Sequence, residues 1–230
     1  YDFCPHGCLY CWAPKVKHIT PAEFHREAKP RVTPTEIKES AIRWAQRVPS
    51  YETSVLLCFT ADPYPSGDST LTRRAIEILH AWGFGVTILT KGGERSTLDF
   101  DLLGPGDAYA TTLTLVTGVD SRKWEPLAAL PIERIFIALR KAHERGIPTW
   151  VSLEPVITPD DSLTAIKLSY LFVDHYKLGI LNYHPLAKTI DWKQYLEDAT
   201  TLLDKLGKPF YVKKDLALHA GKTEGYWEGK

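Results

Sequence analysis

The sequence predicts an α/β protein built on a parallel sheet, because short apolar runs alternate with amphipathic helical segments along most of the chain. The runs recur about every 30 residues, the length of a strand, its crossover helix and the connections. Crossovers of this kind are almost always right-handed. The pattern alone leaves open whether the sheet is flat and doubly wound or curved into a partial barrel.

Each strand is expected where a short apolar run ends in a turn, and each helix where apolar residues recur on one face. Thr33 is the expected N-cap of the first long helix, with Pro34 at its first position and Glu36 closing a capping box. The expected strands are residues 54–59, 86–90, 108–115, 149–153, 170–177 and 210–213. The expected helices are residues 34–48, 71–82, 133–144 and 192–206.

Polar residues follow five of the expected strands in an otherwise apolar pattern. These strand ends are residues 60–64, 90–94, 111–114, 152–155 and 177–182. One such residue alone is typical of a solvated loop, but the carboxyl ends of parallel strands lie at the same edge of a sheet. The sequence therefore predicts one polar pocket at that edge.

Three cysteines near the start of the chain, Cys4, Cys8 and Cys11, form a C-x3-C-x2-C motif. Thiolates at this spacing bind iron–sulfur clusters or zinc. Structural zinc needs four ligands, so that interpretation would require His6 or His18 as the fourth, and a metal-free group of reduced thiols is a further alternative. Three ligands for a four-iron cluster leave one iron open to a substrate.

Composition restricts the class of protein. Lys and Arg total 28 and Asp and Glu total 28, so no net charge attracts the chain to nucleic acid or membrane. No apolar run approaches the roughly 20 residues that span a bilayer. Three cysteines packed within eight residues indicate a metal site in a reducing compartment, the cytoplasm, instead of disulfides. We expect residues 1–230 to form one catalytic domain.

The cysteine motif, with Tyr10 directly before the third cysteine, resembles the signature of the radical S-adenosylmethionine (SAM) superfamily. The resemblance implies a [4Fe-4S] cluster that binds SAM through its open iron and cleaves it reductively to a 5′-deoxyadenosyl radical, which abstracts hydrogen from a substrate. It also implies a partial (β/α)6 TIM-like barrel, with a first strand at or before Tyr1. A flavodoxin or ferredoxin is the kind of electron donor implied.

Further segments resemble the spore photoproduct lyase-like branch of that superfamily. They are residues 8–13, 60–64, 71–73, 88–91, 99–103, 125–134 and 146–157. This branch implies a nucleobase or DNA lesion as substrate, with a peptide or metabolite as the alternative. A non-catalytic cluster module that binds a partner is the alternative from another class.

The resemblance also implies roles for individual residues. Cys4, Cys8 and Cys11 would bind the cluster, and Tyr10 and Trp12 would lie near the adenine. The residues expected to bind SAM or to face its ribose, its methionine moiety or the substrate are Asp62, Lys91, Thr112 or Thr114, Glu154, Lys177 and Asn182.

Two of these assignments depart from the family pattern. Asp62 stands where the superfamily has a Gly-Gly-Glu motif for the SAM amino group, whereas Gly92-Gly93-Glu94 has those letters one strand later. Cys58 is the only cysteine outside the motif, and because Leu57 and Phe59 are apolar we expect a plain buried thiol inside a strand instead of a hydrogen donor.

Overall fold

A seven-stranded sheet forms the centre of the computed structural model, which describes residues 1–229. Strands β1 to β6 are parallel and pair in chain order, and the last strand runs antiparallel to β6. The strands are β1 (Ser54–Leu57), β2 (Gly85–Thr90), β3 (Ala108–Thr112), β4 (Thr149–Leu153), β5 (His175–Leu178), β6 (Phe210–Val212) and β7 (Tyr226–Glu228).

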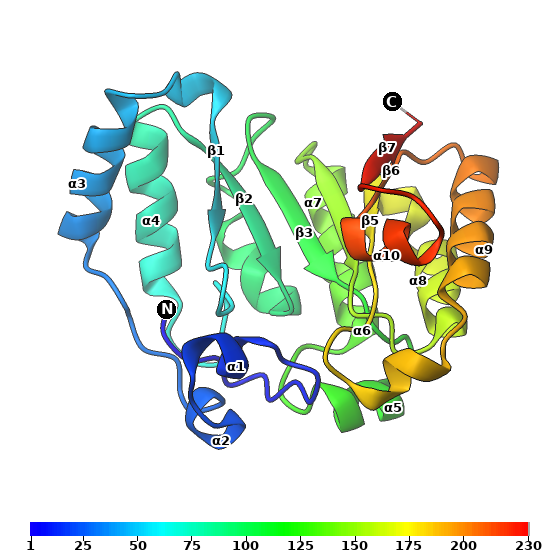
Figure 1. Ribbon diagram of the computed structural model, residues 1–230. Coiled ribbons are helices and arrows are strands. Elements are labelled where there is room, and N and C mark those ends of the chain that lie inside the picture. The colour runs from blue at the N-terminus through cyan, green and yellow to red at the C-terminus, as the bar shows by residue number, and fades with distance from the viewer. Residues whose placement is uncertain (230) are drawn as a thin grey trace.

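Helices connect the strands. Figure 1 shows α3 (Pro34–Ala45) and α4 (Thr70–Ala81) beside the β1 end of the sheet, and α8 (Pro159–Ser169) and α9 (Trp192–Lys205) beside the other end. The remaining α-helices are α1 (Ala13–Lys17), α2 (Pro21–Phe24), α5 (Gly118–Trp124), α6 (Pro131–Glu133), α7 (Arg140–Glu144) and α10 (Lys214–His219). A π-helical segment, Arg134–Leu139, joins α6 to α7.

The strand order distinguishes between the two parallel architectures left open by the sequence. A doubly wound sheet reverses its strand order at a switch point, whereas here every parallel strand lies beside its neighbour in sequence. This order confirms the expected α/β fold as a partial TIM-like barrel. The strand arrows point toward the end of the molecule that carries α1, α2 and α5 (Figure 1).

The central strands are buried on both faces, as parallel strands between helices and a barrel interior should be. All five residues of β4 are buried, and Ile88 of β2 and Tyr109 of β3 are fully inaccessible to solvent. The expected N-terminus of α3 is also confirmed, because Thr33 and Glu36 form a reciprocal capping box. The core therefore fixes the strands whose ends build the site.

Three expected strands differ from the structure by two or more residues at one end. The first ends at Leu57, because Cys58 has a left-handed φ of 57° and leaves the sheet. The expected strand 108–115 ends at Thr112. The apolar residues at 170–172 form a 3₁₀ turn, so that β5 begins only at His175.

The sequence did not predict α8, β7 or the short helices. The strand expected at Tyr1 is not formed in the described residues: Asp2 makes only an isolated antiparallel bridge with Lys29. Within residues 1–229, no helix combines the length and apolar character needed to cross a membrane.

Candidate active site

A cavity of about 610 Å³ lies at the carboxyl ends of the parallel strands. This volume is within the range of sites that enclose small organic ligands. All five polar strand ends singled out in the sequence contribute to its lining, through residues such as Asp62, Lys91, Thr112, Glu154 and Asn182. The predicted pocket is therefore present at the predicted edge of the sheet.

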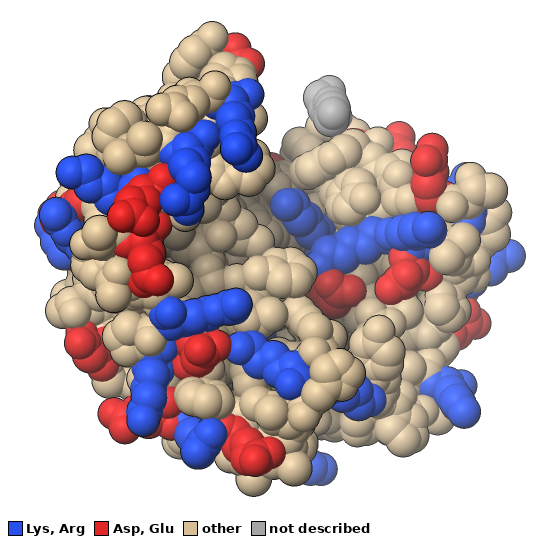
Figure 2. All heavy atoms as spheres, turned by 60° about the vertical axis from the view of Figure 1, so that its left-hand side comes forward, with Lys and Arg blue, Asp and Glu red and all other residues tan. Residues whose placement is uncertain are grey.

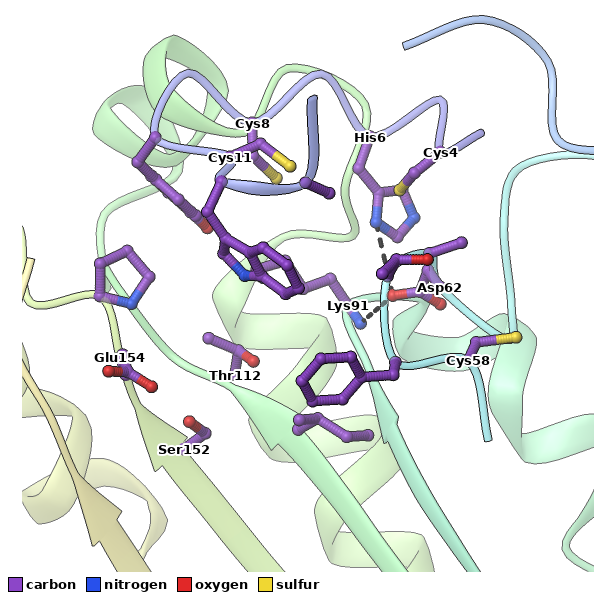
Figure 3. Close-up of a pocket in the computed structure, with 18 of the residues that line it drawn as sticks. Cys4, His6, Cys8, Cys11, Cys58, Asp62, Lys91, Thr112, Ser152 and Glu154 are labelled. Atoms are coloured by element: carbon purple, nitrogen blue, oxygen red, sulfur yellow. Dashed lines mark hydrogen bonds and ion pairs between the residues drawn. The ribbon is translucent and has the colours of Figure 1, made fainter. Parts of the chain in front are cut away.

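The three motif cysteines line this cavity from the segment before α1. In Figure 3 the sulfur atoms of Cys8 and Cys11 lie side by side, Cys4 lies next to His6, and the sulfur of Cys58 points away. The motif folds tightly, because the Cys11 N–H donates to the Cys8 carbonyl at 3.1 Å. The structure thus places the three motif cysteines on one segment at the cavity, with Cys8 and Cys11 adjacent and Cys4 beside His6, and Cys58 lines the same cavity from the end of β1 (Figure 3).

The donor chemistry of this loop fits an iron–sulfur cluster. Among residues 1–229, no three His, Cys, Asp or Glu side chains are placed to hold one metal ion. A cluster has no need of that arrangement, because each cysteine binds a different iron atom. Burial raises the pKa of Cys8 to about 12, and the nearby Lys91 ammonium opposes that rise. Thiolate is the metal-binding form of cysteine, so Lys91 favours the form that a cluster needs.

Of the two histidines considered as zinc ligands, only His6 lines the cavity, where it lies next to Cys4 (Figure 3). His6 is buried, and its Nδ1 lies 3.5 Å from Asp62 Oδ2 (Figure 3). Burial lowers the pKa of His6 to about 4, despite the opposing charge of Asp62, so the ring is neutral at pH 7. His18 is the C-cap of α1 and does not line the cavity.

Asp62 lines the cavity, but its two oxygens already have partners in the protein. Oδ1 accepts from the Tyr64 N–H at 2.8 Å and the Thr90 hydroxyl at 2.5 Å, and Oδ2 accepts from the Lys91 N–H at 2.8 Å. Asp62 therefore joins the turn after β1 to the end of β2. The alternative motif lies outside the cavity lining, where the Glu94 N–H donates to Glu133.

Lys91 follows the last residue of β2, and its side chain lines the cavity. Its main chain is fixed on both sides, by Asp62 and by the Ala129 N–H, which donates to its carbonyl at 3.0 Å. The ammonium lies 5.5 Å from the centre of the Tyr10 ring. Burial disfavours the charged amine, but the electrostatic attraction of Cys8 and Glu125 outweighs the effect of burial. The pKa of Lys91 is therefore raised. The site thus holds a charged ammonium beside the cysteine loop.

The other expected SAM-binding residues divide into two groups. Thr112 and Glu154 line the cavity, and Glu154 forms an ion pair with Lys213 on the same wall. Thr114 and Lys177 do not line it: the Thr114 hydroxyl donates to Glu125 at 2.8 Å, and the Lys177 ammonium lies 3.9 Å from the centre of the Trp150 ring. Binding of SAM by any of these residues stays a prediction.

Aromatic side chains also line the cavity, and the exposed Phe59 lies where it opens to solvent. Trp12 packs against Phe59 with ring centres 5.5 Å apart, and Phe59 is 74% exposed. Tyr10 also lines the cavity, and its hydroxyl donates to Glu125. Tyr10 and Trp12 thus both line the cavity, and their position near the adenine stays a prediction.

Two buried charges behind the cavity were not selected as site residues from the sequence. Glu125 and Arg134 form an ion pair in which both side chains are fully inaccessible. A signal was present, since Glu125 stands two positions before an apolar stretch, residues 127–130, and charged residues are seldom fully buried without a partner. Lys213, which pairs with Glu154 in the cavity lining, was likewise not selected.

Comparison with known families gives the site its context. The model of the radical SAM superfamily matches residues 1–173, about three quarters of the chain. The chain belongs to the radical SAM superfamily. Its members use a [4Fe-4S] cluster and SAM, which agrees with the cysteine loop and the cavity found here. No curated protein sequence gives a significant match to the chain.

Solved structures show the same fold at low sequence identity. The radical SAM chain superimposes on SuiB of Streptococcus suis bound to S-adenosylmethionine, with a TM-score of 0.65, 10% identity, and coverage of 95% of this chain and 50% of that one. For SuiB bound to the precursor peptide SuiA, the TM-score is 0.65 with 12% identity, and coverage is 89% and 44%. The chain thus spans about half the length of SuiB.

Proposed function

We propose that this chain is a radical SAM enzyme that binds its cluster through Cys4, Cys8 and Cys11 and SAM in the adjoining cavity. The observation that carries the proposal is one cavity that presents three cysteines and a charged lysine together. When bound, the cluster would supply one electron that cleaves SAM to methionine and a 5′-deoxyadenosyl radical, the hydrogen-abstracting species.

The residues of the chain would bind and orient SAM. Lys91 would hold the SAM carboxylate, because an ammonium and a carboxylate form a strong charge-assisted contact away from bulk water. Thr112 and Glu154 would contact the ribose or the methionine moiety from the ends of β3 and β4. Trp12 and Phe59 at the mouth would limit the access of water, which quenches reactive intermediates.

For the substrate we propose a nucleobase or a DNA lesion, as in the spore photoproduct lyase-like branch. The motif segments spread over residues 8–157 support this choice. On the face in Figure 2, Lys and Arg lie among Asp and Glu. The fold similarity to a peptide-bound SuiB makes a peptide the second candidate. A flavodoxin or ferredoxin is the proposed electron donor.

The test is SAM cleavage by the anaerobically reconstituted and reduced protein. We expect 5′-deoxyadenosine and methionine to form in equal amounts, measured by chromatography with mass spectrometry. Adding an oligonucleotide with a thymine dimer should accelerate product formation more than a set of short peptides does. An assembled cluster without 5′-deoxyadenosine would support the non-catalytic module, and acceleration by peptides alone would reject the nucleobase.

A further inference from the structure

The side chain of Glu125 is fully buried immediately behind the cysteine loop, directly after the end of α5. A buried carboxylate is costly unless its oxygens are paired. Here Oε1 accepts from the Tyr10 hydroxyl and from the Thr114 hydroxyl, and Oε2 accepts from Arg134. Every described partner of this carboxylate therefore belongs to the cysteine loop, the segment after β3 or the π-helical segment.

Arg134 fixes the carboxylate to the end of β3. Its Nε donates to the Ala129 carbonyl at 2.7 Å, and its Nη1 donates to the Thr112 carbonyl at 2.8 Å. Since Thr112 lines the cavity, the Glu125–Arg134 pair is anchored on the wall that faces the cysteines. The guanidinium thus holds Glu125 at a defined distance from the strand ends.

The main chain supports the same attachment. The Leu9 N–H donates to the Trp124 carbonyl at 2.9 Å, and the Leu127 N–H donates to the His6 carbonyl at 3.1 Å. Gly7 has a φ of 70°, and a side chain there would meet the Pro126 ring at 3.6 Å. Residues 124–127 therefore form a platform under residues 6–9, and the Tyr10–Glu125 contact is its side-chain attachment.

Stability alone does not account for such a pair. Replacing a buried ion pair by packed apolar residues is often neutral or stabilising, so a fully buried pair is weak evidence for a stabilising role. What the pair specifies is position: Tyr10 lies between Cys8 and Cys11, so the bond from its hydroxyl to Glu125 ties this part of the loop to the end of α5.

We propose that Glu125 is a positioning residue of the radical SAM site, which acts through Tyr10 to hold Cys8 and Cys11 at the end of β3. What this positioning serves, the binding of a cluster by the cysteines, rests on the proposed function. Its geometry stands independently, because the contacts join side chains of the chain itself.

Hydrogen exchange of the metal-free full chain tests the attachment directly. In Tyr10→Phe, which keeps the Glu125–Arg134 pair, we expect the amides of residues 5–12 to exchange about tenfold faster, as loss of a hydrogen bond to a charged group predicts. Glu125→Gln should have a similar effect. The double variant should exchange no faster at these residues than the more affected single variant, because both changes act on the loop through the same Tyr10–Glu125 contact.

Asp107→Asn is the matched control. Asp107 is also buried and accepts from His80, Val86 and Gly104, but at the opposite end of β3. It should destabilise the fold without accelerating exchange at residues 5–12. Equal acceleration in this control, or unchanged exchange in Tyr10→Phe, would overturn the proposal.

A second readout separates positioning from the proposed function. In the reconstituted protein, Glu125→Gln should lower the rate of SAM cleavage at saturating SAM by about tenfold, whereas Asp107→Asn should not. If the wild-type chain assembles no cluster, the proposed function fails, and the exchange experiment still decides on the attachment.

Discussion

Replacing Lys91 by alanine will weaken SAM binding about tenfold to a hundredfold while leaving the cluster assembled, because the change removes a charged hydrogen-bond donor from the cavity. The alanine keeps the main-chain N–H that donates to Asp62 and the carbonyl that accepts from Ala129, so the end of β2 should stay in place. Equilibrium binding of SAM to the reconstituted variant measures the effect, with iron content as the check on the cluster.

Lys141→Ala is the control for a lysine that is held by the fold and lies outside the cavity. The Lys141 ammonium donates to the Thr97 hydroxyl at 3.1 Å on the outer layer, and it does not line the cavity. Its removal should leave SAM affinity unchanged. Unaltered SAM affinity in Lys91→Ala would mean that another group holds the SAM carboxylate, and the role of Lys91 would be lost.

Cys8→Ala and Cys58→Ala should have opposite outcomes although both cysteines line the same cavity. Loss of Cys8 removes one of three cluster ligands, and we expect iron content after reconstitution to fall close to background. Loss of Cys58 should leave about four irons per chain, because its sulfur points away from the other three (Figure 3). Iron and sulfide analysis together with the visible absorption of the cluster measures both.

Cys58→Ala tests the assignment of three cysteine ligands more severely than Cys8→Ala does. If Cys58→Ala loses its iron, Cys58 binds the metal centre and the three-cysteine assignment is wrong. If zinc instead of iron is found in the wild-type chain, the alternative of a structural zinc site becomes the better account.

Much of the fold follows from local sequence patterns. The capping box of Thr33 and Glu36 and the apolar runs of β2 and β4 depend on neighbouring residues, so the sequence predicts them well. The bounds that differ depend on tertiary contacts. Cys58 leaves the sheet through a left-handed backbone that no neighbouring residue signals, and the apolar residues 170–172 satisfy a 3₁₀ turn as well as a strand.

The parts of the candidate site that form local sequence motifs were predictable from the sequence. Three close cysteines indicate one centre from their spacing alone, and polar strand ends indicate one pocket. The Tyr10–Glu125 contact joins residues 115 positions apart, so no spacing rule reveals it. The direction of Lys177 and Thr114 away from the cavity likewise depends on register and packing, which place them against Trp150 and Glu125.

Electron paramagnetic resonance of the anaerobically reconstituted and reduced protein, recorded with and without SAM, tests the central claim most directly. Three cysteine ligands leave one iron open, so we predict a [4Fe-4S] signal whose shape changes when SAM is added. A signal that is the same with and without SAM would mean that no open iron meets SAM in this cavity. That result would contradict the proposal that the chain is a radical SAM enzyme, and a structural cluster module would be the remaining account.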